Sequence, residues 1–190
     1  MTKLDAAGAG NEKAATDLQT VHTVSLTQDS ATLDGQSLEV SQKGKALLTE
    51  LYKKLSCDYP KFYKMDVLSR LVFIGAQMLA SRENPTEADR EDRAIILFNK
   101  STSIVSDRVH IATIADRESF FPSPSVFLYT LPNIAIGEVA IRHSFKGETS
   151  LFILPRKDEE TMAMITEATA LGSGVSSMLT GWADCPERTR

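Results

Sequence analysis

The chain has few residues of the kinds that build metal centres, disulfide frameworks and nucleophilic sites. It contains two cysteines, Cys57 and Cys185, and three histidines. The cysteines lie far apart and form no CxxC motif, and no histidine belongs to an HExxH or HxxxH pair. We therefore expect neither a disulfide framework nor a zinc site. Free thiols of this kind are typical of a reducing compartment, which predicts a cytoplasmic protein.

Long apolar runs and clustered positive charge are also missing. The longest apolar run, residues 71–80, is half as long as a membrane span and contains Gln77. The net charge is −4, and the lysines and arginines are dispersed, which argues against nucleic acid as a partner. The nearest approach to a GxSxG elbow, Gly172-Ser173-Gly174, is typical of a helix end. We expect no membrane span, no nucleic acid, no metal and no cofactor.

The residues that are present favour one α/β domain. Residues 1–17 have no apolar pattern and are predicted to form a disordered tail, so the domain covers residues 18–190. Alternating residues around Asp34-Gly35 predict a β-hairpin over 20–40, and the nearly all-apolar run 93–100 predicts a strand buried on both faces. The expected fold is a mixed, mainly parallel sheet with helices on both faces and an N-terminal hairpin. Helices are predicted over 42–55, 65–83, 101–116, 124–131, 134–145 and 158–174, a polar loop over 84–92, and further strands over 147–155 and 175–185.

One short segment combines aromatic and basic residues, as protein interfaces often do. It contains Lys61, Phe62, Tyr63 and Lys64. The segment is either a docking patch for an acidic partner or a loop whose aromatic rings pack inward while its lysines stay in water. Both interpretations remain open at the level of sequence.

Four segments together resemble the N-terminal half of β-ketoacyl synthases, the condensing enzymes of the thiolase superfamily. They read YPKFYKMDVLSRL, SPSVFLYTLPNIAIGEVAIRH, KGETSLFIL and MLTGWADC, and the resemblance covers residues 20–185. Its most specific element is the Asn133-x-x-x-Gly137 helix followed by the turn at Gly147. The resemblance implies a thiolase-like half-domain in which another backbone approaches Gly137 closely.

The resemblance also implies where a nucleophile would stand. In these enzymes the strand after the glycine leads to a cysteine at a helix N-terminus, which lowers the thiol pKa. The matching positions are Pro155, Arg156 and Lys157, so the family cysteine falls near Arg156 and no catalytic residue is assigned. The family's remaining catalytic residues belong to a C-terminal half that we do not expect in this chain. The acidic residues Asp158 to Glu160 are expected to satisfy the helix dipole internally.

The leading interpretation is a catalytically incomplete accessory subunit of a bacterial fatty acid or polyketide type pathway. The resemblance implies a dimer, with itself or with a complete ketosynthase, and an acyl carrier protein as a further possible partner. The strand implied to pair across the dimer axis consists of Ser150, Leu151, Phe152, Ile153 and Leu154.

Two alternatives remain open. One is an enzyme, either half of a split condensing enzyme completed by another chain or a protein with a new site using His143 or Cys185. The other is a small-molecule binding module with an acyl pocket near Phe127, Tyr129 and Phe152.

Overall fold

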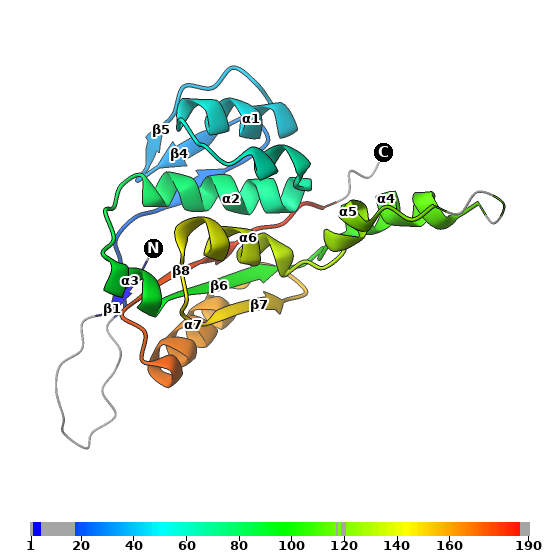
Figure 1. Ribbon diagram of the computed structural model, residues 1–190. Helices are drawn as coiled ribbons and strands as arrows, with labels where there is room; N and C mark the ends of the chain where they lie inside the picture. Colours follow the sequence, from blue (N-terminus) through cyan, green and yellow to red (C-terminus); the bar gives the residue numbers. More distant parts are fainter. Residues whose placement is uncertain (1, 5–17, 117, 119–120, 187–190) are drawn as a thin grey trace.

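A mixed five-stranded sheet forms the centre of the computed structural model (Figure 1). The structure describes residues 2–4, 18–116, 118 and 121–186. The strand order is β2-β1-β8-β6-β7, in which β6, β7 and β8 are parallel and β1 is antiparallel to both of its neighbours. The strands are β1 (Thr2–Leu4), β2 (Leu18–Thr20), β6 (Arg93–Asn99), β7 (Thr149–Ile153) and β8 (Ser177–Trp182).

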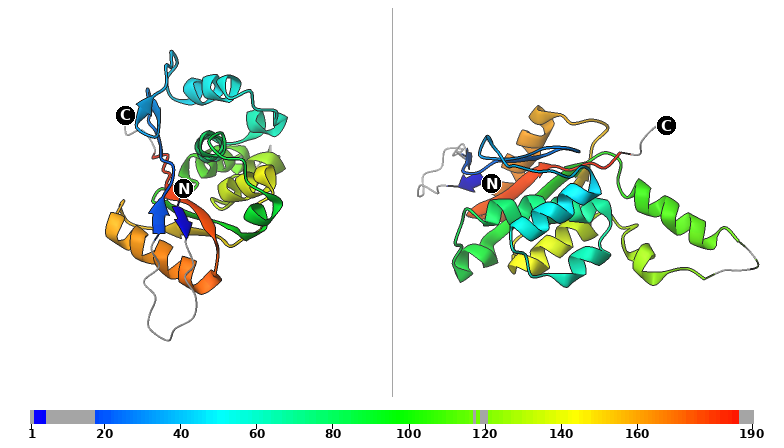
Figure 2. Two further views of the ribbon diagram at one scale, coloured as in Figure 1. Left: turned by 90° about the vertical axis from the view of Figure 1, so that its left-hand side faces the viewer. Right: turned by 90° about the horizontal axis from the view of Figure 1, so that it is seen from above.

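Helices cover both faces of this sheet (Figures 1 and 2). Helices α2 (Val67–Ala80) and α6 (Ile134–His143) pack against each other on one face, and α7 (Glu159–Ser173) lies on the other. Asp66 caps the start of α2 by accepting a hydrogen bond from the Ser69 amide, and Asp158 caps the start of α7 by accepting one from the Thr161 amide. The predicted α/β architecture is therefore confirmed.

A separate three-stranded sheet lies beside α2. It consists of β3 (Val24–Leu26), β4 (Ala31–Leu33) and β5 (Gln36–Ser37), all antiparallel. Asp34 and Gly35 have φ angles of 53° and 75°, as a two-residue hairpin turn requires. Helix α1 (Lys45–Lys54) follows and buries Leu47, Leu48 and Leu51 against α2. The predicted hairpin is present and gains a third strand.

The main core lies between α1, α2, α6 and the sheet. All seven residues of β6 are buried, as the apolar run predicted. The largest fully buried side chains include Phe62, Phe73 and Phe98. Beneath α7 the buried cluster is much smaller and consists of Ala94, Ala170, Val175 and Met178. The α2–α6 face therefore carries most of the stabilising apolar burial.

Two helices form an arm that projects from the carboxyl ends of the strands (Figures 1 and 2). They are α4 (Ile104–Ile114) and α5 (Pro124–Leu128), which contact each other. The sequence predicted both helices, α4 from the spacing of its apolar residues and α5 from Ser123 and Pro124 at its start. It did not predict that α4 would stand away from the body with Ser106 as its one buried residue.

Two regions differ from the sequence-based expectation. Residues 84–92 were predicted to be a loop, but a capping box between Thr86 and Asp89 starts a short helix, α3 (Glu87–Asp92). The predicted tail differs at its start, because Thr2–Leu4 is strand β1, paired with β2 and β8. The rest of that tail, residues 1 and 5–17, lies outside the described residues.

Candidate functional site

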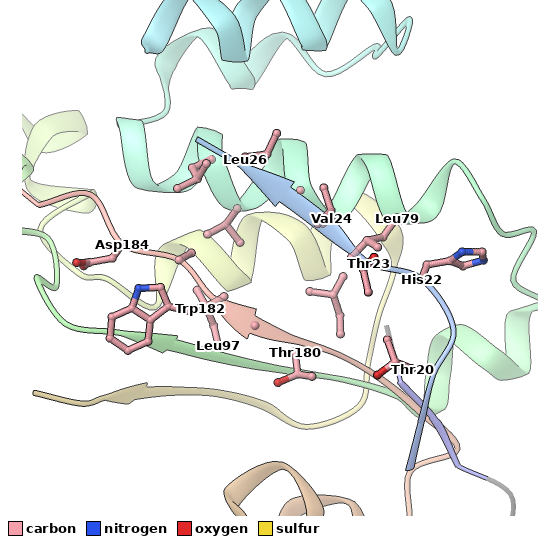
Figure 3. A pocket seen from close by; sticks show the side chains of 17 residues that line it. Thr20, His22, Thr23, Val24, Leu26, Leu79, Leu97, Thr180, Trp182 and Asp184 are labelled. Carbon is pink, nitrogen blue, oxygen red and sulfur yellow. The ribbon is translucent and has the colours of Figure 1, made fainter. Parts of the chain in front are cut away.

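A groove lies between β3 and the carboxyl half of β8 (Figure 3). Its volume is about 370 Å³. Apolar side chains from β3, α2 and the sheet make up most of its wall. They include Val24, Leu26, Leu71, Leu79, Leu97 and Leu179.

Two strand edges border this groove. Strand β8 pairs with β1 only at Ser177 and Met178, so Leu179–Trp182 have a strand partner only on the β6 side among the described residues. In the part of the chain that the structure describes, strand β3 pairs with β4 and with no other strand. The groove is therefore an apolar slot with open backbone groups on both sides, which suits an elongated apolar ligand.

Asp184 lies at one end of the groove (Figure 3). Its carboxylate accepts hydrogen bonds from the Ser101 amide at 2.8 Å and the Ser101 hydroxyl at 3.1 Å. The Asn99 amide group donates to the carbonyl of Ala183 at 2.6 Å. These bonds tie the chain after β6 to the chain after β8, so Asp184 acts as a structural clamp. The sequence signal that could have found it is its position at the carboxyl end of the predicted strand 175–185.

Cys185 borders a second cavity of about 480 Å³, which shares Leu26, Leu71 and Asp184 with the groove. Burial, together with the negative charges of Asp66 and Asp184, raises the pKa of the Cys185 thiol to about 12. Burial also raises the pKa of Cys57. A thiolate is the nucleophilic form of cysteine, so neither thiol is activated for acyl transfer.

His143 lies at the end of α6, stacked on Phe145 with their ring centroids 5.2 Å apart. Its Nε2 atom is buried and has no hydrogen-bond partner among the described residues. Burial, helped by the positive charges of Arg142, Arg93 and Arg90, lowers the pKa of His143 from 6.5 to about 4. Within the described residues, no group of three or more His, Cys, Asp or Glu side chains is arranged to hold a metal ion. His143 is thus a neutral, largely buried imidazole at pH 7.

His143 should make the fold sensitive to acid. The folded chain disfavours the protonated ring, whereas the unfolded chain binds that proton below about pH 6.5. The contribution of the neutral His143 ring to the free energy of unfolding is therefore complete above pH 6.5 and is lost as the pH falls toward 4. Between pH 7 and pH 4, we expect the free energy of unfolding to fall by about 2 kcal/mol more in the native protein than in His143→Leu. Urea unfolding at both pH values measures this difference, and equal losses would contradict the assignment.

The turn between β7 and α7 is where the resemblance places a nucleophile. Pro155, Arg156 and Lys157 are exposed. Lys157 pairs with Glu159 at 3.0 Å, and the Asp158 side chain accepts a hydrogen bond from the Thr161 amide at the start of α7. This helix N-terminus is therefore already capped by its own chain.

The proposed docking patch does not form one surface. Phe62 is fully buried, stacked on Tyr52 at 4.3 Å, so its inclusion was wrong. Lys61 reaches inward and pairs with buried Glu138 at 2.6 Å, which leaves Tyr63 and Lys64 exposed. A carboxylate from a distant helix thus decides the orientation of the segment.

Glu138 is a buried carboxylate with several polar partners, and the sequence analysis did not identify it as a candidate site residue. It is 2% exposed on α6 and accepts hydrogen bonds from the hydroxyls of Tyr59 at 3.2 Å and Tyr129 at 3.5 Å, in addition to the Lys61 ion pair. Burial, then the charges of Glu138 and Asp66, raises the pKa of Tyr129 to about 12. The four side chains join α6, the segment before α2 and the base of the arm.

The residues of the predicted acyl pocket are not gathered in one place. Phe127 is 54% exposed on the arm, and Tyr129 is buried in the main core against Glu138. Phe152 stacks on Phe98 and borders a depression beside α7. Side chains alternate along β7, so Leu151 packs on the main-core face and Phe152 on the α7 face. The prediction that Phe127, Tyr129 and Phe152 line one pocket was therefore wrong.

The close backbone approach is at Gly147 and not at Gly137. A Cβ atom at Gly137 would have no neighbour within 4 Å among the described residues outside the backbone of its own helix. At Gly147 it would lie 2.5 Å from the carbonyl oxygen of Arg93. The expectation for Gly137 was wrong, because the contact that needs a glycine is between the turn before β7 and the start of β6.

Strand β7 is an edge strand whose outer side has no partner among the described residues. Glu148 accepts a hydrogen bond from the Ile95 amide, and the Leu154 amide donates to Asn99. Backbone groups alternate in direction along a strand. Ser150, Phe152 and Leu154 therefore point their amides toward β6, whereas Leu151 and Ile153 point theirs outward. Ile153 is also 48% exposed.

No protein-family model matches this chain, and no curated protein matches it either. In the described part of the chain, none of the helices has the length and apolar character needed to cross a membrane.

Proposed function

We propose that this chain is a non-catalytic, ketosynthase-like accessory subunit of a bacterial fatty acid or polyketide type pathway. It acts by binding a partner, either a second copy or a complete ketosynthase, with an acyl carrier protein as a further partner. The observation that carries this proposal is the open edge of β7 beside a turn without a nucleophile. The raised pKa values of both cysteines support a binding role over acyl transfer.

The edge of β7 suits strand pairing. It presents outward amide and carbonyl groups at alternate residues, and it contains no proline or lysine, which often protect exposed edges from association. Antiparallel pairing with a second copy would join two five-stranded sheets into one around a two-fold axis.

The variant Ile153→Pro should abolish this pairing. Proline removes the outward amide, while the bonds from β7 to β6 use the alternate residues. We expect the native protein to elute as a dimer in size-exclusion chromatography and the variant as a monomer. Ile153→Thr keeps the amide and should remain dimeric. A dimeric Ile153→Pro protein would exclude the β7 edge as the pairing surface.

A condensation assay separates the accessory subunit from the split enzyme. The purified chain should not elongate an acyl-carrier substrate, because the β7–α7 turn offers Arg156 where the resembled enzymes have cysteine. Elongation by this chain alone would refute the proposal. A gain in condensation rate that requires Cys185 when a synthase is added would favour the split enzyme.

The groove between β3 and β8 favours a second candidate, an acyl-binding module. Its wall is mostly apolar, and it shares lining residues with the cavity at Cys185. Native mass spectrometry of the purified protein should then show a bound acyl chain that is lost in Leu97→Gln. Absence of any bound mass under conditions that preserve the fold would count against this candidate.

A further inference from the structure

The gap between β3 and β8 is hollow on both faces of the sheet. The groove described above lies on the α2 side, and a further cavity of about 710 Å³ lies on the α7 side of the same two strands. No described residue of β4 or β5 lines either cavity, so β4 lies on the far side of β3. The residues that border both cavities include Val24, Leu26, Thr180, Gly181 and Trp182.

The backbone of β8 directs hydrogen-bonding groups into this gap. The Ala183 amide donates to the carbonyl of Phe98 on β6, and backbone groups alternate in direction along a strand. Thr180 and Trp182 therefore direct their amides and carbonyls away from β6. Within the described ranges of the chain, no strand pairs with either residue on that side.

Strand β3 offers matching groups from the opposite side. The Asp34 amide donates to the carbonyl of Thr23, so the alternate residues Val24 and Leu26 direct their amides and carbonyls away from β4. A Cβ atom at Gly75 of α2 would lie 3.8 Å from Val24 and 4.0 Å from Leu26, which places both side chains against α2. Both borders of the gap are thus strand edges ready to pair.

Strand β1 occupies the same row beside the amino half of β8. It is antiparallel to β8, with Thr2 opposite Met178, and β2 pairs on its other side. Strand β3 follows β2 in the chain and runs in the same direction as β8 (Figure 3). A strand that continued the line of β1 beyond Thr2 would therefore lie between β3 and residues 180–182, antiparallel to both.

The two cavities differ in chemistry, and a strand in the gap would point its side chains to them alternately. The α2-side cavity is mostly apolar, whereas Lys157, Glu159 and Glu167 border the α7-side cavity. Leu179 packs in the main core, so Gly181, two residues further on, faces the same side. A Cβ atom at Gly181 would have no described neighbour within 4 Å, which leaves room for an apolar side chain of the inserted strand.

We propose that the gap between β3 and β8 is a docking site for an extended segment of a partner protein. The segment pairs with both strand edges, antiparallel to β8, and carries apolar side chains at alternate positions that face α2. An acyl chain fits the apolar side of the gap but has no amide groups for either edge, whereas a peptide strand satisfies both. Strand β6 separates β8 from β7, so this site goes beyond the proposed function and does not depend on β7 pairing.

Hydrogen exchange with defined peptides tests the pairing. The probes are blocked six-residue peptides that alternate threonine with valine, leucine or phenylalanine. In the free protein the amides of Leu179 and Gly181, which point toward β6, should exchange slowly, and those of Thr180 and Trp182 rapidly. We expect at least one probe to slow exchange at Thr180 and Trp182 tenfold or more. The same probe methylated on every second amide nitrogen should lose this effect, because one row of bonds is removed.

The variant Gly181→Leu tests the occupied position. Its side chain should fill the space on the α2 side, lower the affinity for the peptide at least tenfold and leave the melting temperature unchanged, because nothing described lies near the Cβ position. Gly172→Leu on α7 is the matched control. Its Cβ position is also open, and it borders neither cavity, so the affinity should not change.

Three results would overturn strand docking. They are equal binding of methylated and unmethylated probes, an affinity unaffected by Gly181→Leu, and no change in exchange with any probe at about 1 mM. An acyl chain that is retained in native mass spectrometry and that no probe displaces also overturns it and favours the acyl-binding module. None of these results changes the expectation for Ile153→Pro, which acts on β7 alone.

Discussion

Replacing Gly147 with alanine should lower the free energy of unfolding by about 3 kcal/mol. The new Cβ atom would lie 2.5 Å from the carbonyl oxygen and 2.6 Å from the carbonyl carbon of Arg93. Both are backbone atoms at the start of a fully buried strand, so they cannot move without disturbing the β6–β7 pairing. Urea denaturation measures the loss.

Gly137→Ala is the matched control. Among the described residues, no atom outside the neighbouring backbone of α6 lies within 4 Å of its Cβ position, and Gly137 is in the interior of α6. Alanine favours a helix over glycine by about 0.5–1 kcal/mol, so this variant should be slightly stabilised. A stable Gly147→Ala protein together with a destabilised Gly137→Ala protein would contradict the close backbone approach at Gly147. It would favour an approach at Gly137, as the resemblance implies.

Replacing Lys61 with methionine should lower the free energy of unfolding by about 3 kcal/mol. Glu138 is 2% exposed, and its ion pair with Lys61 is 2.6 Å long. Without the lysine, the carboxylate stays buried, and the hydroxyls of Tyr59 and Tyr129 are its remaining side-chain donors among the described residues. The cost is that of an uncompensated buried charge, which chemical denaturation at pH 7 measures.

The double variant Lys61→Met with Glu138→Gln controls for the loss of packing. A glutamine carbonyl can still accept from both tyrosines, so the double variant should recover about 2 kcal/mol of the loss. Removing the Glu138 charge should also lower the pKa of Tyr129 from about 12, because that charge disfavours the phenolate. If Lys61→Met and the double variant have the same free energy of unfolding, the unpaired Glu138 charge is not the cause of the loss, and the ion pair does not stabilise the fold.

Strong local signals predicted most of the fold. The apolar run 93–100 could be buried only as a two-faced strand, and Asp34-Gly35 specified a tight hairpin turn. Helix α3 was missed because Thr86 and Asp89 stand in a polar stretch without apolar periodicity. The projection of the arm was not predictable, because the apolar residues of α4 are not gathered on one face and so do not indicate which side of the helix packs on the body.

The site was predicted less well because its contacts are non-local. The orientation of Lys61 depends on Glu138, which no sequence spacing connects to it. Tyr129 and Phe152 are separated by a sheet whose faces depend on the register of β7, which Gly147 helps to set. The identity of β7 as a strand was clear, but its place at the edge of the sheet followed only from the strand order.

The exchange rate of the Leu151 amide tests the central claim most directly. This amide points out of the β7 edge, whereas the neighbouring Phe152 amide points toward β6. If β7 pairs with a partner strand, residue-resolved hydrogen exchange of the purified protein should show both amides protected. Rapid exchange at Leu151 beside slow exchange at Phe152 would mean that the edge is open in solution and would contradict the account.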